Sequence, residues 1–231
     1  MSNVCIIPAR GGSKRIPRKN IKDFLGKPII AYSIEVALQS GLFDEVMVST
    51  DDLEIAEIGK KYGVKVPFLR SGKNSDDHAS TADVLEEVIK DYLKAGKEFS
   101  HACCLYPTAP FVKPEHLIEG NKMIMNNGVD SVFPIVKFDY PIWRGLRKKE
   151  KGEVEMVWNE YSNSRSQDLE QVFHDAGQWY WFNVKRFLDG MKLFTENSKG
   201  IELSPLEVQD IDNDHDWHLA EMKYAYLQSL K

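Results

Sequence analysis

The order of hydrophobic and polar residues divides the first 138 positions into short apolar runs that alternate with segments of helical period. Strands are predicted over residues 4–9, 45–50, 101–107 and 131–138, with a strand or sheet-edge piece at 64–69. Helices are predicted over residues 28–41, 53–63, 80–96 and 114–128, the third with Ser80 or Thr81 as its cap. Because strands that alternate with helices of this length are joined by right-handed crossovers, the pattern predicts an α/β fold, a Rossmann-like three-layer α/β/α sandwich with a mostly parallel sheet.

Residues 139–181 break this alternation. The stretch is polar yet rich in aromatic residues, which leaves two alternatives, a disordered insertion or an ordered excursion that reaches a partner or the substrate. Its aromatic residues favour the ordered alternative. Beyond it, one helical face is shared by Trp217, Ala220, Tyr224 and Leu227. This face predicts a last helix that covers the sheet, so residues 1–231 are expected to form a single domain with one excursion.

The composition limits the possible classes of protein and partner. The chain has 231 residues, of which 42% are hydrophobic, and a formal net charge of −5. A domain with this charge is not expected to bind nucleic acid, because neutralising phosphates requires a basic excess. Cys5, Cys103 and Cys104 lie in apolar runs, which indicates neither a disulfide framework nor a metal site. Without a signal segment or a long apolar run, we expect a cytoplasmic protein that does not contact a membrane.

The first strand is followed by a basic loop, "ARGGSKRIPRKN", at residues 9–20. Its spacing matches neither the P-loop nor the GxGxxG motif. Gly11 and Gly12 are expected to adopt positive φ and expose main-chain N–H groups to an anion, while Arg10, Lys14 and Lys19 close on phosphate oxygens. Because the loop after the first strand of such a sheet is a usual phosphate site, the loop predicts triphosphate binding. A solvated basic loop is the alternative.

Two later strand ends are expected on the same side of the sheet. The sequence "STDD" at residues 49–52 ends the second strand, where Asp51 or Asp52 could instead cap the next helix. Tyr106, Pro107 and Thr108 lie at the end of the strand predicted over residues 101–107. Proline would stiffen this shelf so that Thr108 presents its hydroxyl to a substrate. A proline-rich strand exit without a contact role is the alternative.

Near the end of the chain, Asp210 and Asp212 flank the apolar Ile211 in "VQDIDND". On an extended segment this spacing puts both carboxylates on one face. Two close carboxylates repel unless a cation lies between them, and Mg²⁺ prefers hard oxygen ligands. The pair is therefore a candidate site for Mg²⁺. The six histidines show no paired ligand spacing and are interpreted as structural or solvent-facing.

These motifs resemble those of the cytidylyltransferases that activate nine-carbon acidic sugars and KDO, in which the loop after the first strand runs ARxxSKxxPxKN. The likeness continues in order through "VSTDDLEIAEIGKKYGVKVPFLR", "LYPTAPFV" and "VQDIDND". Within this family, "NSRSQDLE" and "HDAGQWYW" look most like the pseudaminic acid branch. The resemblance implies a nucleotide-diphospho-sugar transferase-like fold. It also implies an enzyme that makes a CMP-sugar and pyrophosphate from CTP and the acidic sugar.

The resemblance implies roles for individual residues as well. Arg10, Lys14 and Lys19 would neutralise charge on the triphosphate, and Mg²⁺ on Asp210 and Asp212 would polarise the α-phosphate. Arg70 would lie against the cytosine. The full set of nucleotide contacts would be Ala9, Gly11, Gly12, Ser13, Asn20, Arg70 and Ser80. The sugar contacts would be Tyr106, Pro107, Thr108, Arg165, Gln167 and Tyr180. Many members of the family carry Gln in place of Tyr106, which suggests a differently shaped sugar pocket.

The family further implies a homodimer, in which the excursion buries Trp143, Trp158 or Phe173 against the partner and brings Arg165 and Gln167 to an acidic sugar. A rigid flap within one chain is the alternative. Sialic acid and legionaminic acid are the alternative sugars. Two other classes of protein share these features, a nucleotide-sugar glycosyltransferase and a non-catalytic nucleotide-binding regulator. Neither of them would release pyrophosphate from CTP and a free sugar.

Overall fold

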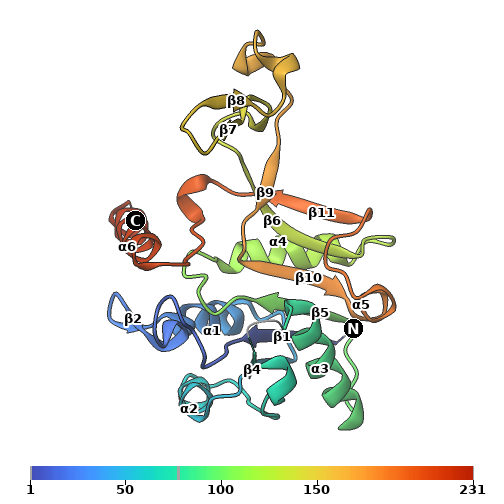
Figure 1. The fold of residues 1–231 in the computed structure, drawn as a ribbon. Helices are drawn as coiled ribbons and strands as arrows, with labels where there is room; N and C mark the ends of the chain where they lie inside the picture. The colour runs from blue at the N-terminus through green and yellow to red at the C-terminus, as the bar shows by residue number, and fades with distance from the viewer. Residues whose placement is uncertain (1, 77–78, 231) are drawn as a thin grey trace.

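The centre of the protein is one sheet with helices packed on both of its faces (Figure 1). The structure is a computed structural model that describes residues 2–76 and 79–230. Within these residues the sheet has seven strands in the order β11-β6-β10-β5-β1-β4, with β9 also paired to β6. The strands are β1 (Asn3–Pro8), β4 (Glu45–Ser49), β5 (His101–Leu105), β6 (Ser131–Lys137), β9 (Phe173–Asp175), β10 (Trp179–Asn183) and β11 (Ser198–Glu202).

The sheet is mostly parallel, as predicted, but one antiparallel strand joins its two halves. β4, β1 and β5 run parallel to one another, and β11 runs parallel to β6. β10 is antiparallel to both β5 and β6. Because β10 lies largely within residues 139–181, the predicted end of the excursion was wrong. Trp179 and Trp181 of this strand are completely buried in the core.

The side chains of β1 alternate between the two faces of the sheet and so contribute to two hydrophobic clusters. Cys5 and Ile7 belong to the cluster covered by α1, α2 and α4. Val4 and Ile6 belong to the cluster covered by α3 and α5. The three-layer architecture is therefore confirmed. The helices are α1 (Ile29–Ser40), α2 (Leu53–Lys61), α3 (Thr81–Lys94), α4 (Pro114–Ile124), α5 (Val184–Gly190) and α6 (Asp214–Ser229).

The last helix, α6, packs beside the sheet and not over it, so the prediction that it covers the sheet was wrong. The predicted face is correct and consists of Trp217, Ala220, Tyr224 and Leu227. This face lies against the small hairpin of β2 (Asp23–Phe24) and β3 (Lys27–Pro28). The rings of Phe24 and Trp217 meet edge to face, with 5.5 Å between their centroids. The helix therefore packs against the β2–β3 hairpin, which follows the basic loop in the sequence.

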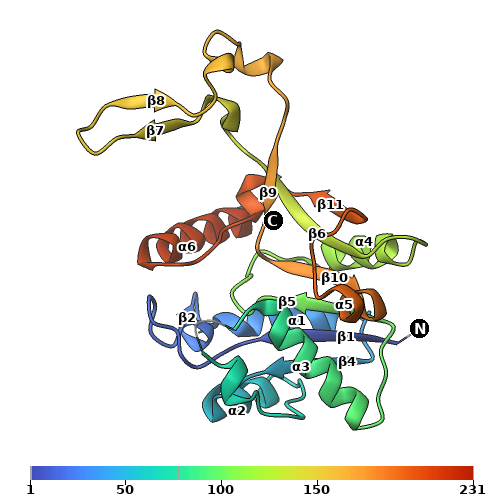
Figure 2. The ribbon, with the colours of Figure 1, turned by 45° about the vertical axis from the view of Figure 1, so that its right-hand side comes forward.

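Residues 138–172 form an arm that projects away from the sheet (Figures 1 and 2). None of its side chains is buried. Aromatic contacts order it, since the rings of Trp143 and Trp158 lie 5.7 Å apart and Trp143 donates its indole N–H to the carbonyl of Glu170 at 3.0 Å. Its regular elements are β7 (Leu146–Lys148), β8 (Val154–Met156) and the 3₁₀ helices Ile142–Arg144, Asn159–Tyr161 and Ser166–Asp168.

Residues 64–69 run beside β4 without forming a regular strand. They make two isolated bridges, from Met47 to Lys65 and from Thr50 to Leu69, so this piece belongs to the sheet edge. Further 3₁₀ helices lie at Lys19–Ile21, Gly72–Asn74 and Pro205–Glu207. No helix in the described part of the chain is both long enough and apolar enough to cross a bilayer.

Gly120→Ala is expected to destabilise the protein, although alanine is favoured over glycine in a helix by about 1 kcal/mol. A Cβ atom at this position of α4 would lie 2.7 Å from ring atoms of both Trp179 and Trp181, which have no room to move. We expect the free energy of unfolding, measured with urea, to fall by about 1–3 kcal/mol. Gly59→Ala in α2 is the matched control, because its Cβ would meet valine side chains at 3.3 Å and beyond. Equal stability of Gly120→Ala and the parent would contradict the packing described.

Candidate active site

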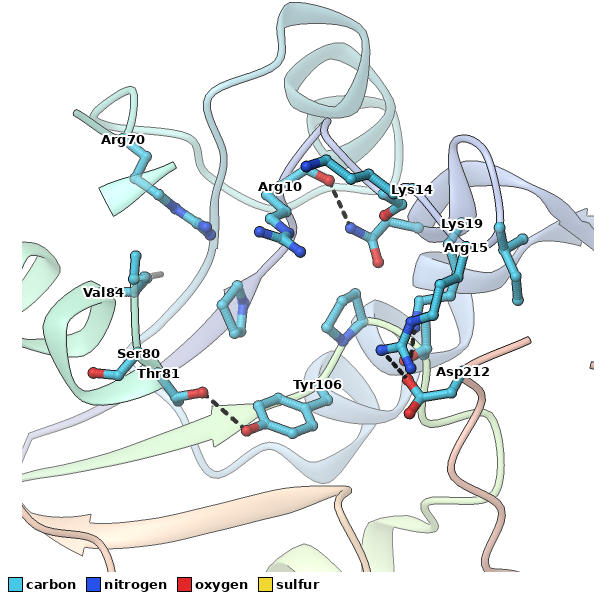
Figure 3. A pocket seen from close by; sticks show the side chains of 17 residues that line it. Arg10, Lys14, Arg15, Lys19, Arg70, Ser80, Thr81, Val84, Tyr106 and Asp212 are labelled. Carbon is cyan, nitrogen blue, oxygen red and sulfur yellow. Dashed lines mark hydrogen bonds and ion pairs between the residues drawn. The ribbon is translucent and has the colours of Figure 1, made fainter. Parts of the chain in front are cut away.

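A cavity of about 230 Å³ lies at the edge of the sheet where β1 and β5 end (Figure 3). Open α/β sheets bind ligands at this edge, beyond the carboxyl ends of their strands. Residues from distant parts of the chain meet there. Those predicted from the sequence that line the cavity are Arg10, Ser13, Lys14, Lys19, Asn20, Arg70, Ser80, Tyr106, Pro107, Thr108 and Asp212.

The cavity carries an excess of positive charge, although the chain as a whole is acidic. Among the described residues that line it, five are basic, namely Arg10, Lys14, Arg15, Lys19 and Arg70, and one is acidic, Asp212. Cationic groups that converge from several directions suit a ligand with several phosphate oxygens. Sequence reasoning did not single out Arg15, because nothing local distinguishes it from the other basic residues of the loop.

The two loop glycines do not adopt positive φ, so that prediction was wrong. The N–H group of Gly11 is bound to the carboxylate of Asp51 at 2.9 Å. A Cβ atom on Gly11 would lie 2.7 Å from a carboxylate oxygen of Asp52, whereas one on Gly12 would meet nothing within 4 Å. Gly11 therefore permits the loop to approach residues 51–52 closely. Its N–H group is already hydrogen-bonded to Asp51.

Arg18 anchors the basic loop to the start of α2. It adopts a left-handed conformation, with φ of 54°. Its two terminal nitrogens bind the Asp52 carboxylate at 2.5 and 3.0 Å, and one of them also binds Glu54. Asp52 caps α2 as well, by accepting two N–H groups of the first turn. The sequence predicted such a cap as an alternative but did not reveal the ion pair of Arg18 with Asp52. This ion pair fixes the position of the turn that carries Lys19.

Lys19 ties the loop to the segment of residues 210–212. Its ammonium group donates to the carbonyl of Ile211 at 2.6 Å and lies 3.9 Å from the carboxylate of Asp212. Arg15 binds the same carboxylate at 2.8 Å, as Figure 3 shows. Burial lowers the pKa of Lys19, against the opposing attraction of Asp212 and Asp210. A partly desolvated ammonium group attracts an anion more strongly than one in water.

The carboxylates of Asp210 and Asp212 are close enough to interact but line different cavities. Ile211 between them is buried, which agrees with the predicted alternation. Asp210 lines a neighbouring cavity of about 520 Å³, which Asp175 also lines. Burial first, and then the charge of Asp212, raises the pKa of Asp210. In the described part of the chain no cluster of three or more His, Cys, Asp or Glu residues could hold a metal, so a cation here would need oxygens from a ligand as well.

Arg70 and the first turn of α3 form another part of the cavity wall. Arg70 donates to the carbonyl of Ser49 at 2.5 Å and to its hydroxyl at 3.2 Å, and burial lowers the pKa of Arg70. Ser80 is the cap of α3, since its hydroxyl accepts the N–H group of Asp83 at 3.2 Å. The structure thus selects Ser80 and not Thr81 as the cap. Thr81 lines the cavity together with Ser80, which the sequence did not reveal.

Tyr106, Pro107 and Thr108 form the wall that follows β5. The hydroxyl of Tyr106 shares a hydrogen bond of 3.0 Å with that of Thr81, and burial raises the pKa of Tyr106 to about 12. Tyr180 of β10 packs behind Tyr106, with 5.6 Å between the ring centroids. Tyr180 is buried and supports this wall from behind.

The remaining predicted site residues, Arg165, Gln167 and Ala9, do not line the cavity in a single chain either. Arg165 and Gln167 belong to the arm, which points away from the sheet (Figure 1). Arg165 pairs with Asp168 at 2.7 Å, and Gln167 lines a separate cavity of about 340 Å³ at the arm. Ala9 is buried where β1 ends, and its N–H group donates to the carbonyl of Ser49.

Comparison with known proteins gives the chain a wider context. A family model described as cytidylyltransferase matches residues 4–198. The chain is 45% identical over 224 residues to a pseudaminic acid cytidylyltransferase of Campylobacter jejuni, with 97% of each chain covered. It is 34% identical over 234 residues to a CMP-N,N'-diacetyllegionaminic acid synthase of Legionella pneumophila, with 96% and 95% covered. Its fold is similar to a solved CMP:2-keto-3-deoxy-manno-octonic acid synthetase complexed with CTP, with a TM-score of 0.69, 19% identity and coverage of 99% and 100%.

Asp52→Asn should destabilise the folded state in a pH-dependent way, because asparagine keeps the helix cap and removes the charge that binds Arg18. Hydrogen bonds from Arg18, opposed by burial, lower the pKa of Asp52 from 3.8 to about 2. The stabilisation of the folded state by the negative charge of Asp52 is therefore fully present above pH ~4 and is lost as the pH falls toward ~2. After allowance for solvent screening, we expect a loss of about 1–2 kcal/mol at neutral pH.

Urea denaturation of both proteins between pH 2 and pH 7 measures this difference. Glu57→Gln in the same helix is the control, since its exposed pair with Lys60 contributes little. A difference between parent and Asp52→Asn that is constant over the whole pH range would contradict the ion pair as its cause.

Proposed function

Because the chain belongs to the cytidylyltransferase family, we propose that this nucleotidyltransferase transfers the cytidylyl group of CTP to pseudaminic acid and releases pyrophosphate. The observation that carries the proposal is the basic cavity at the carboxyl ends of β1 and β5, formed by the motifs shared with the family. Pseudaminic acid is preferred because the relative named for it is 45% identical over 97% of both chains. Legionaminic acid and sialic acid are the second choices, supported by relatives of 34% and 35% identity.

The reaction is an in-line displacement at the α-phosphorus of CTP. The anomeric hydroxyl oxygen of the sugar forms the new P–O bond, the bond to the β-phosphate oxygen breaks, and the hydroxyl proton is released. Such a transfer requires positioning and charge stabilisation more than covalent chemistry. Arg10, Lys14, Arg15 and Lys19 would bind the triphosphate oxygens and stabilise the charge that develops on the leaving pyrophosphate.

The opposite part of the cavity would hold the base and the sugar. Arg70 is fixed by its two bonds to Ser49 and lies beside the first turn of α3, where it would contact the cytosine. Tyr106, Pro107 and Thr108 would face the sugar, and the aromatic ring of Tyr106 would limit its size. Ser13 and Asn20 lie on the side of the triphosphate. The side-chain amide of Asn20 also donates a hydrogen bond to the carbonyl of Arg10 at 2.8 Å. This bond fixes the path of the loop main chain.

Asp210 and Asp212 fit a Mg²⁺ ion that is shared with the substrate. The charge of Asp212 helps to raise the pKa of Asp210, and a cation between the two carboxylates would relieve their repulsion. One or two carboxylates together with phosphate oxygens are the ligands that Mg²⁺ commonly takes in such sites. When bound, Mg²⁺ would supply further neutralisation of the triphosphate charge.

The exposed apolar surface of the arm supports the proposal that the active form of the enzyme is a homodimer. Its exposed apolar residues include Leu146 and Val154, with 63% and 61% of their surface accessible in a single chain. A symmetric partner that covers this surface would bury it, and it would bring Arg165 and Gln167 to the sugar bound by the other subunit. The three cysteines are free and buried, which supports a location in the reducing cytoplasm.

Lys19→Ala is expected to reduce kcat/KM for CTP by about 10²–10³, as the loss of a fixed charge does in other enzymes. The assay measures pyrophosphate released from CTP, Mg²⁺ and a panel of nine-carbon acidic sugars. Lys22→Ala is the matched control, because Lys22 lies three positions away, pairs with Asp214 and does not line the cavity. The parent should be most active with pseudaminic acid.

Several results of this assay would contradict the proposal. Sugar transfer from a ready-made donor without pyrophosphate release would indicate a glycosyltransferase, and CTP binding without turnover would indicate a regulator. Near-normal kcat/KM in Lys19→Ala, with circular dichroism showing that the variant is folded, would remove Lys19 from the triphosphate site.

Arg165→Ala is expected to inactivate the enzyme, and its mixture with inactive Lys19→Ala should recover activity if each sugar site uses both subunits. Random exchange of subunits makes half of the dimers mixed, and each mixed dimer has one site with both residues intact. We therefore expect about one quarter of the parent activity after exchange, measured as pyrophosphate release. A flap within one chain would instead give no recovery, and light scattering of a monomer would contradict the dimer itself.

A further inference from the structure

A buried hydroxyl group of α1 lies directly behind the cavity wall that is proposed to face the sugar. Ser33 is completely buried, although it is polar. Ile30 and Ala37, three positions before it and four positions after it, share its helical face and pack in the core of the sheet. A hydroxyl group in such surroundings has to be hydrogen-bonded, because burial without a partner is costly.

The partner of this hydroxyl group lies in a distant part of the chain. Ser33 donates to the carbonyl of Tyr106, 73 positions further on, at 2.8 Å. A serine within a helix can instead bond a carbonyl of its own helix, as Ser40 of α1 does with Ala37 at 2.7 Å. Ser33 therefore joins α1 to the end of β5, where the cavity wall begins.

Tyr106 is held by three elements at once. Its N–H group donates to the carbonyl of Gln178, directly before β10, at 2.8 Å. Its phenol hydroxyl shares a hydrogen bond of 3.0 Å with Thr81 at the start of α3 (Figure 3). Its carbonyl accepts the hydroxyl of Ser33. Of these three contacts, the one from Ser33 acts on the peptide unit that leads into Pro107.

The orientation of this peptide unit is passed on to Thr108. A peptide unit is planar, and the ring of Pro107 fixes φ at about −65°. Between the carbonyl held by Ser33 and the Cα atom of Thr108, ψ of Pro107 is thus the one torsion that turns easily. Pro107 and Thr108 both line the cavity, whereas Ser33 does not.

We propose that Ser33 is a positioning residue for the sugar, whose hydroxyl fixes the Tyr106 carbonyl and so sets where Pro107 and Thr108 meet the substrate. The inference rests on the proposed function and adds to it a determinant of sugar binding that lies outside the cavity. The triphosphate side of the cavity is formed by the basic loop and is held by other contacts. Loss of the Ser33 hydroxyl should therefore affect the sugar and not CTP.

The test compares Ser33→Ala with the parent in the pyrophosphate assay. Loss of one neutral hydrogen bond shifts an equilibrium by about three- to tenfold, so KM for the sugar should rise by this factor while KM for CTP stays nearly unchanged. A general loss of stability would not separate the two KM values. Ser33→Cys nearly keeps the volume of the side chain but has only a weak donor, so it should raise KM for the sugar as well.

Ser40→Ala is the matched control, because it removes a hydroxyl group of the same helix whose bond stays within α1. Both of its KM values should equal those of the parent. The inference is overturned if Ser33→Ala keeps the parent KM for the sugar or raises both KM values equally. It is also overturned if Ser33→Cys behaves like the parent, since packing and not the donor would then be what matters.

A second substitution tests whether Ser33 acts through the wall. Thr108→Val keeps the shape of the side chain and removes the hydroxyl that would face the sugar. If Ser33 acts by placing this hydroxyl, adding Ser33→Ala to Thr108→Val should raise KM for the sugar by less than Ser33→Ala does in the parent. Effects that multiply in the double variant would overturn the inference.

The anchor can also be measured without a substrate. Amide hydrogen exchange, followed by mass spectrometry on peptides that contain Tyr106, Thr108 and Ala109, should be about three- to tenfold faster in Ser33→Ala than in the parent or in Ser40→Ala. Unchanged exchange in this segment would overturn the inference. If the exchange differs as expected but the parent releases no pyrophosphate, the proposed function alone is contradicted.

Discussion

The positive charge of the basic loop has to be held at the edge of the sheet by carboxylates that lie outside the loop. Cations gathered around one cavity repel one another, and the repulsion grows as they leave water. Asp52 from the start of α2 binds Arg18, and Asp212 from near the end of the chain binds Arg15. These two anchors come from segments that lie far apart in the sequence. The cavity and its charge depend on this arrangement.

The antiparallel strand β10 connects the packing of the core to the shape of the cavity. Trp179 and Trp181 point to one face of the sheet, where α4 approaches closely because Gly120 has no side chain. Tyr180 points to the other face by the alternation of a strand. It reaches the back of Tyr106 there. The same five residues therefore close the core and support the wall on the side proposed for the sugar.

The arm has a different physical character from the rest of the chain. It has no buried residue of its own and is held by a few aromatic contacts and by its hairpin. A segment of this kind gains stability when another surface covers it. The proposed dimer would provide that surface, and it would explain why Arg165 lies away from the cavity of its own chain.

The sequence by itself determined the regular elements β1, β4, β5 and β6, because hydrophobic period and capping residues such as Ser80 act over a few positions. It also determined which motifs meet at one edge, since parallel strands place the loops that follow them together. The tertiary structure alone decided the place of β10, the partners of α6, the ion pair of Arg18 with Asp52 and the packing role of Gly11. Each of these depends on a contact between segments far apart along the chain, and such a contact leaves no local pattern in the sequence.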